Sequence, residues 1–196
     1  MRTPVFSITA TRCVQMAAML VPALLLSGCI GAQNHSDVEA EARQRGGGAE
    51  PFVIREAVEA VAAEVSADPD ELLVASIRIY PQYVTLEAAD PRTPGNWDRY
   101  QYRNGRVADT DPVNVAHMAP AGFMLGDFRA LDRLPELVAD AGRRAGFAEG
   151  RLTSLEISAE VDHMTGETSG PKLSTHHSDP RRGIARHEYD ADGHLL

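Results

Sequence analysis

The chain has 196 residues, with 19 basic and 28 acidic side chains and a formal net charge of −9 at pH 7. That length is sufficient for one domain with a substantial core. The acidic balance gives no electrostatic reason to bind nucleic acid, and the sequence has neither a glycine-rich phosphate loop nor a basic stripe interleaved with aromatics. We therefore predict no nucleic-acid partner.

The beginning of the chain has the three-part layout of a secretory signal. Arg2 and Arg12 are the only charged residues before Cys29, and an almost uninterrupted apolar run covers residues 14–26. As a helix, that run would rise about 20 Å, which is less than the roughly 30 Å hydrocarbon core of a bilayer. This length favours a removed leader over a transmembrane span.

A cysteine follows two small residues at the end of this run, in the stretch Leu26-Ser27-Gly28-Cys29. The stretch resembles the lipobox of bacterial lipoproteins. The resemblance implies that residues 1–28 are a signal peptide, and that Cys29 carries a diacylglycerol and acyl chains such as palmitate that hold the protein on the membrane. The alternative is an ordinary secretory signal with a chance cysteine. Ile30 stands where an acidic residue would retain such a lipoprotein in the inner membrane, so we expect the outer membrane, facing the periplasm, in an organism that has one.

Cysteine usage fits an exported protein. Cys13 lies in the predicted signal peptide and Cys29 is predicted to be alkylated, so the mature chain has no free thiol and no disulfide. This excludes cysteine catalysis and cysteine-ligated metals, and we predict no cofactor. Loss of Arg2 and Arg12 with the signal leaves 17 basic against 28 acidic residues, a net charge of −11.

Residues 29–50 have the composition of a flexible tether. They are mostly polar or small, include Gly46-Gly47-Gly48, and hold almost no large apolar side chain. A flexible segment of this length has a mean reach of about 25 Å.

Periodic apolar residues predict a helix directly after Pro51. The spacing is helical, and Asp68-Pro69-Asp70 ends the pattern; the apolar members are Ile54, Val58, Val61 and Val65. Alternation then predicts strands over 73–80, 83–88 and 99–103. Asn104-Gly105 favours a type I′ hairpin turn to residues 106–107. Residues 108–126 are expected to be irregular.

The same order of elements follows in the second half of the chain. A second helical stripe consists of Leu134, Leu137, Val138, Ala141 and Ala145. Strand patterns follow near 154–160, 173–178 and 186–189. Landmarks recur in one order, since Thr85, Asp90-Pro91-Arg92, Tyr102 and Gly105 match Thr175, Asp179-Pro180-Arg181, Tyr189 and Gly193.

We therefore predict an α+β fold of two tandem repeats, each a helix plus a three-stranded antiparallel meander, packed as one globular domain over 51–196. Repeat one is 51–107, the linker is 108–127 and repeat two is 128–196. The alternative is two unrelated α+β segments. The element order resembles the small PepSY-like modules of exported bacterial proteins, and that resemblance implies a binding or peptidase-modulating module without enzymatic activity.

Histidines are concentrated near the C-terminal end. The last 34 residues hold five of the seven, which are His163, His176, His177, His187 and His194. Around the turn at Asp179, His176 and His187 are predicted to be near cross-strand neighbours, and with Glu160 or Asp162 nearby they are candidate zinc or copper ligands. A register slip of one residue would place them on opposite faces of the sheet. The alternative is that these imidazoles are exposed or hydrogen-bonded.

Two further features have both a functional and a structural interpretation. Residues 166–170, Gly-Glu-Thr-Ser-Gly, are similar to a nucleophile elbow but lack its strand–turn–helix context, so a simple loop is favoured. Aromatic residues cluster around the first meander and either close a core, which is favoured, or form a binding face; they are Tyr80, Tyr83, Trp97, Tyr100 and Tyr102.

No motif in the chain predicts catalysis. We expect a membrane-anchored envelope lipoprotein that is a non-catalytic binding or interaction module, with an envelope protein as a candidate partner. The alternative is a small-ligand or metal carrier that uses the histidine-rich C-terminal repeat. A buried pocket joining His176 and His187 to a carboxylate would favour the carrier, whereas a solid core with a flat exposed sheet face would favour the binding module.

Overall fold

The computed structural model describes residues 50–114, 121–147, 151–162 and 164–196. The lipobox ending at Cys29, the predicted signal peptide and the predicted tether up to residue 49 lie outside these ranges. Among the helices that are described, none is both long enough and apolar enough to cross a membrane.

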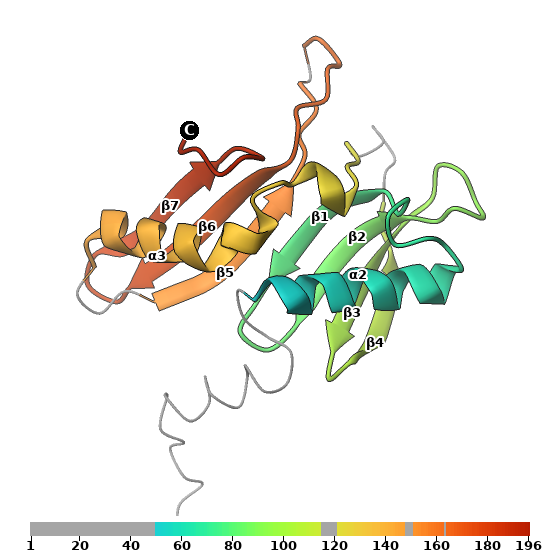
Figure 1. Ribbon diagram of the computed structural model, residues 1–196, viewed down its shortest axis with the longest axis horizontal. Helices are drawn as coiled ribbons and strands as arrows, with labels where there is room; N and C mark the ends of the chain where they lie inside the picture. Colours follow the sequence, from blue (N-terminus) through green and yellow to red (C-terminus); the bar gives the residue numbers. More distant parts are fainter. Residues whose placement is uncertain (1–49, 115–120, 148–150, 163) are drawn as a thin grey trace, which may run out of the picture. The chain divides into compact units, whose positions relative to one another are not determined.

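The described residues form a mixed α+β structure built on a seven-stranded antiparallel sheet (Figure 1). The strand order is β4-β3-β2-β1-β5-β6-β7. The strands are β1 (Val74–Ile79), β2 (Val84–Ala89), β3 (Trp97–Arg103), β4 (Arg106–Pro112), β5 (Arg151–Ser158), β6 (Lys172–Asp179) and β7 (Gly183–Tyr189). The helices are α2 (Pro51–Val65) and α3 (Leu134–Ala145), with short 3-10 turns at Leu125–Asp127 and Leu131–Arg133. The predicted fold class is confirmed at this level.

Both helices begin and end where local chemistry requires. Each has a proline in its first turn, where the missing N–H has no partner to lose. The residue after each helix is left-handed, Ser66 with φ 59° and Gly146 with φ 61°, which closes the last turn. The predicted stripe of α2 is confirmed, because Ile54, Val58 and Val61 are all at most 2% exposed.

The β3–β4 hairpin has the predicted turn, but its second strand is longer than expected. Asn104 and Gly105 have φ values of 55° and 75°, as a type I′ turn requires. Residues 108–112, which we expected to be irregular, continue β4 as far as Pro112. The sequence hides this strand because β4 is an exposed edge strand whose side chains mostly face solvent, so no apolar alternation marks it.

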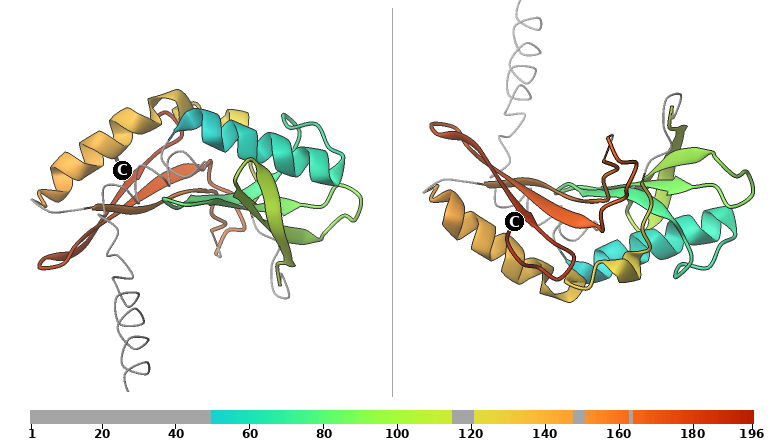
Figure 2. Two further views of the ribbon diagram at one scale, coloured as in Figure 1. Left: turned by 90° about the horizontal axis from the view of Figure 1, so that it is seen from below. Right: turned by 90° about the horizontal axis from the view of Figure 1, so that it is seen from above.

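Both helices pack on the same face of the sheet. Tyr102 donates a hydrogen bond to Glu56 of α2 (3.2 Å), and Tyr189 donates one to Asp140 of α3 (3.1 Å). Cross-strand pairing puts both tyrosines on the face that carries the buried residues Ile77 and Ile79. No described helix packs on the other face, which we call the open face, and Figure 2 shows the two helices together on one side of the sheet.

The two halves of the described structure join through a single strand pair. β1 lies antiparallel to β5, with Ile77 opposite Ile157 on the helix face and Arg78 opposite Glu156 on the open face. Both isoleucines are 0% exposed. One continuous core therefore runs beneath both helices.

The two outer strands differ in chemistry. On β4, Asp109, Asp111 and Pro112 are exposed and discourage pairing with another strand. On β7, the chain turns back after the strand, and Leu195 forms a bridge with Tyr189. This return covers the last positions of that edge.

Candidate functional site

The structure does not bring the predicted ligand pair together. On β6 and β7, His176 lies opposite Arg186, and His187 lies opposite Thr175. Adjacent positions on a strand point to opposite faces, so His176 lies on the open face and His187 on the helix face. The register of β6 against β7 differs by one residue from the one that would make His176 and His187 neighbours on one face. These two side chains therefore do not form the ligand pair that we predicted for a metal carrier.

His187 shares the helix face with His177, which sequence reasoning did not assign to a site. His177 is 5% exposed, and the Nδ1 atoms of both histidines are buried without a hydrogen-bond partner in the described structure. Burial, with smaller contributions from His187 and His176, lowers the pKa of His177. Burial therefore favours the neutral imidazole of His177, and a Cβ atom placed on Gly142 of α3 would lie 3.5 Å from its Nε2. Strand alternation predicts that His176 and His177 point to opposite faces, but only the observed register shows that His177 and His187 share the helix face.

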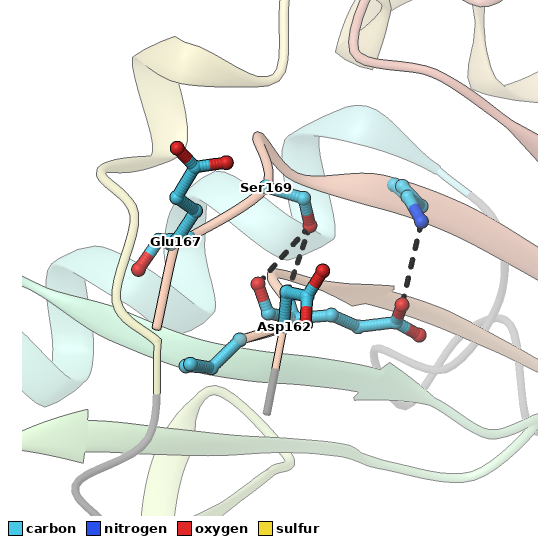
Figure 3. A pocket seen from close by; sticks show the side chains of 7 residues that line it. Asp162, Glu167 and Ser169 are labelled. Carbon is cyan, nitrogen blue, oxygen red and sulfur yellow. Dashed lines mark hydrogen bonds and ion pairs between the residues drawn. The ribbon is translucent and has the colours of Figure 1, made fainter. Parts of the chain in front are cut away.

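The expected carboxylates, Glu160 and Asp162, lie in the β5–β6 loop, away from the predicted ligand pair. They line an open cavity of about 450 Å³ together with Val161, Glu167, Thr168, Ser169 and Lys172 (Figure 3). Glu160 is paired with Lys172 at 3.3 Å. Asp162 accepts hydrogen bonds from the backbone N–H groups of residues 164 and 165, which stabilise the loop.

Ser169 has no geometry of a nucleophile. Its hydroxyl donates to the backbone oxygen of Glu160 and accepts from the backbone N–H of the same residue, both at 3.2 Å. A nucleophilic serine needs a base within hydrogen-bond reach. Ser169 instead closes the base of the loop, in agreement with the favoured loop interpretation.

A second group of polar side chains lies in the turn after β7. Asp190, Asp192 and His194 place their ligand-type atoms within 4.8 Å of one another, and sequence reasoning did not single out this set. Asp192 accepts two hydrogen bonds from Arg129, at 2.5 and 2.7 Å, which lower its pKa. The pKa of Asp190 is lowered chiefly by the backbone N–H of His194. These hydrogen bonds indicate that the cluster stabilises the turn after β7.

The open face carries a regular arrangement of polar and charged side chains. Cross-strand register places on it Arg78, Tyr80, Tyr83, Thr85, Glu87, Arg99, Gln101, Arg103, Ser154, Glu156, Ser174, His176, Arg186 and Glu188. Its ion pairs are Arg99–Glu87 at 2.7 Å, Arg186–Glu188 at 2.6 Å and Arg78–Glu156 at 3.1 Å. The last of these crosses the junction between β1 and β5.

The aromatic residues of the first meander divide between the two faces. Tyr100 and Tyr102 are 2% and 3% exposed on the helix face, so the core interpretation is right for them. Tyr80 and Tyr83 are partly exposed at the β1–β2 hairpin, where their rings stack with centroids 4.7 Å apart. This stacked pair belongs to the open face.

No protein-family model, curated protein or solved structure matched this chain.

Proposed function

We propose that this protein is a membrane-anchored lipoprotein of the cell envelope, and that its folded part is a non-catalytic module that binds another envelope macromolecule on the open face. The observation that carries the proposal is the combination of a continuous buried core beneath the helices with an exposed sheet face that no described helix covers. These are the features expected of a binding module and not of a carrier with an internal site.

The anchor gives such a module a physical advantage. Two or more acyl chains at Cys29 hold a protein firmly at a membrane, and a flexible tether of residues 30–50 lets the domain search the space nearby. Confinement near the membrane raises the effective concentration of the domain relative to a partner held in the same envelope. If the organism has two membranes, we place the anchor in the outer membrane, facing the periplasm.

We also propose that the domain arose by tandem duplication. Tyr102 lies opposite Val84, and Tyr189 lies opposite Leu173, at corresponding points of the two meanders. Each tyrosine donates a hydrogen bond to an acidic residue of the helix in its own half. If Tyr102 and Tyr189 correspond, His187 corresponds to Tyr100. Thr175 corresponds to Leu86, however, so the pairing of Thr175 with Thr85 is shifted by one residue.

Metabolic labelling with palmitate tests the anchor. The natural chain should incorporate label and fractionate with membranes, whereas Cys29→Ala should lose both properties. A matched change at the other cysteine, Cys13→Ala, should leave labelling intact because Cys13 belongs to the removed segment. Label retained by Cys29→Ala would contradict the anchor.

Crosslinking in the native envelope tests the binding function. A photo-reactive residue in place of Gln101, on the open face, should capture a partner that mass spectrometry identifies. The same probe in place of Arg143, exposed on α3, is the control for contacts made anywhere on the surface. Equal capture from both positions would contradict binding through the open face.

A further inference from the structure

Two arginines face each other at the end of the open face. In the β3–β4 hairpin, Arg103 lies directly opposite Arg106. Like charges in this position destabilise a sheet unless another group neutralises them. In the described ranges neither guanidinium has an ion-pair partner, whereas Arg78 and Arg99 of the same face are each paired with a glutamate.

One of these guanidinium groups is also incompletely hydrogen-bonded. The Nε atom of Arg103 is buried and has no partner among the described residues. A buried donor without a partner costs about 1–3 kcal/mol, and more when the group is charged. The fork of N–H groups on an arginine matches the two oxygens of a carboxylate or phosphate. Arg103 and Arg106 together therefore present guanidinium N–H groups that no carboxylate of the described residues receives.

Aromatic rings continue the line from Arg103 toward the middle of the sheet. One position beyond the Val84–Tyr102 pair, the register brings Tyr83 opposite Arg103, and Tyr83 stacks on Tyr80. We call Arg106, Arg103, Tyr83 and Tyr80 the arginine–tyrosine row. It contains no carboxylate. The nearest acidic residue by register is Asp109, which lies opposite Gln101 in the next row.

The negative charge of the whole chain does not prevent anion binding here. Interactions between exposed charges fall off over about 8 Å at physiological ionic strength, so the nearest groups dominate. Around the row these groups are Arg103 and Arg106, with Asp109 in the next row as the nearest carboxylate. The carboxylate Glu87 on the same face is already engaged by Arg99.

We propose that the arginine–tyrosine row binds the acidic groups of an anionic polysaccharide of the cell envelope. The proposal rests on the proposed function, since it names the ligand class of the open face. Tyrosine and arginine are also enriched in protein interfaces, so an acidic protein is the competing occupant that the test must distinguish. The exposed large aliphatic side chains of the open face, Leu73 beside Ala89 and Ile184 on β7, lie outside the row. The row itself offers two guanidinium groups for acidic groups and two stacked tyrosine rings for the flat faces of sugar rings. A hydrated, charged chain fits that surface.

Binding of polygalacturonate tests the proposal. The full chain carrying Cys29→Ala, which avoids acyl chains, should bind this polymer and not neutral dextran of the same length. Arg103→Gln and Arg106→Gln should each weaken binding about tenfold, as expected for loss of a charge-assisted hydrogen bond. Arg143→Gln, an exposed arginine on the helix side, should leave affinity unchanged. Because Arg106 is exposed, its variant keeps the test valid even if Arg103→Gln is unstable.

Two results would overturn the proposal. One is wild-type binding that is absent or insensitive to both arginine variants. The other is equally tight binding of polyglutamate with the same arginine dependence, which would assign the row to an acidic protein. Either result leaves the proposed function standing if crosslinking from the open face still captures a partner, so the two failures are distinguishable.

Discussion

At the scale of single residues, the most consequential position is His177. Its side chain lies on the helix face of β6 with an unpartnered Nδ1, and burial lowers its pKa. A lowered histidine pKa means that the unfolded chain binds a proton more readily than the folded one. The stability that His177 contributes as a neutral group is therefore complete above its unfolded pKa of about 6.5 and is lost as the pH falls below it.

We predict that the domain loses stability between pH 7 and pH 5, and that His177→Gln reduces this loss. The variant removes the group that must stay neutral, so its free energy of unfolding should depend less on pH in that window. Urea unfolding at a series of pH values measures the effect. His194→Gln, whose ring is exposed, is the control. An identical pH dependence in His177→Gln and the natural chain would show that His177 is not the titrating group.

At the scale of elements, α3 shows how a helix is seated on a sheet. Its apolar stripe buries Leu134, Leu137 and Ala141, and Asp140 accepts hydrogen bonds from Tyr189 and Arg144. Gly142 lies above His177 in the helix interior, where glycine is an unfavourable residue. A Cβ atom placed on Gly142 would lie 3.5 Å from Nε2 of His177, which is an ordinary van der Waals contact.

We predict that Gly142→Ala stabilises the domain by about 0.5–1 kcal/mol, the usual gain of helix propensity. The midpoint of urea unfolding should rise without a change in slope. Gly122→Ala is the contrasting variant, because its Cβ would approach Cγ of Leu73 to 2.4 Å and should destabilise the domain. Destabilisation by Gly142→Ala would mean that α3 packs closer to β6 than the structure shows.

Helices and strands were predictable from the sequence where one face of the element is buried and the other is exposed to solvent. The stripes of α2 and α3 and the alternation in β2 follow that rule, and their positions were correct. β4 was missed beyond residue 107 because an edge strand needs few apolar residues. The histidine pair failed for a different reason. Periodicity identifies alternate faces but not the register of one strand against the next, and a shift of one residue separated His176 from His187.

The whole described domain depends on the β1–β5 junction. Ile77 and Ile157 are fully buried there, and the Arg78–Glu156 ion pair crosses the same rungs on the open face. Each half would otherwise present a strand edge to solvent. Because the sheet is continuous through this junction, stabilisation of one half is shared with the other.

We predict that Ile157→Ala, in the second half, destabilises the whole domain by about 2–4 kcal/mol through the cavity that it leaves. Trp97 is the only tryptophan of the chain and lies on β3 in the first half. Its fluorescence should therefore shift to lower urea together with far-UV circular dichroism, in one transition. A Trp97 transition that stays at its original midpoint would show that the halves unfold separately.

The unlike borders of the sheet set a limit on how these molecules can associate. The edge strand β4 carries Asp109 and Asp111, whose negative charges would repel the same strand of a second copy. The edge strand β7 is partly paired with its own chain through Leu195. Neither edge therefore offers a long unpaired strand with which a neighbouring molecule could form a β-ladder. If the chain is anchored as proposed, copies crowded on one membrane should therefore remain separate molecules and not assemble into fibres through their edge strands, and each keeps its open face available.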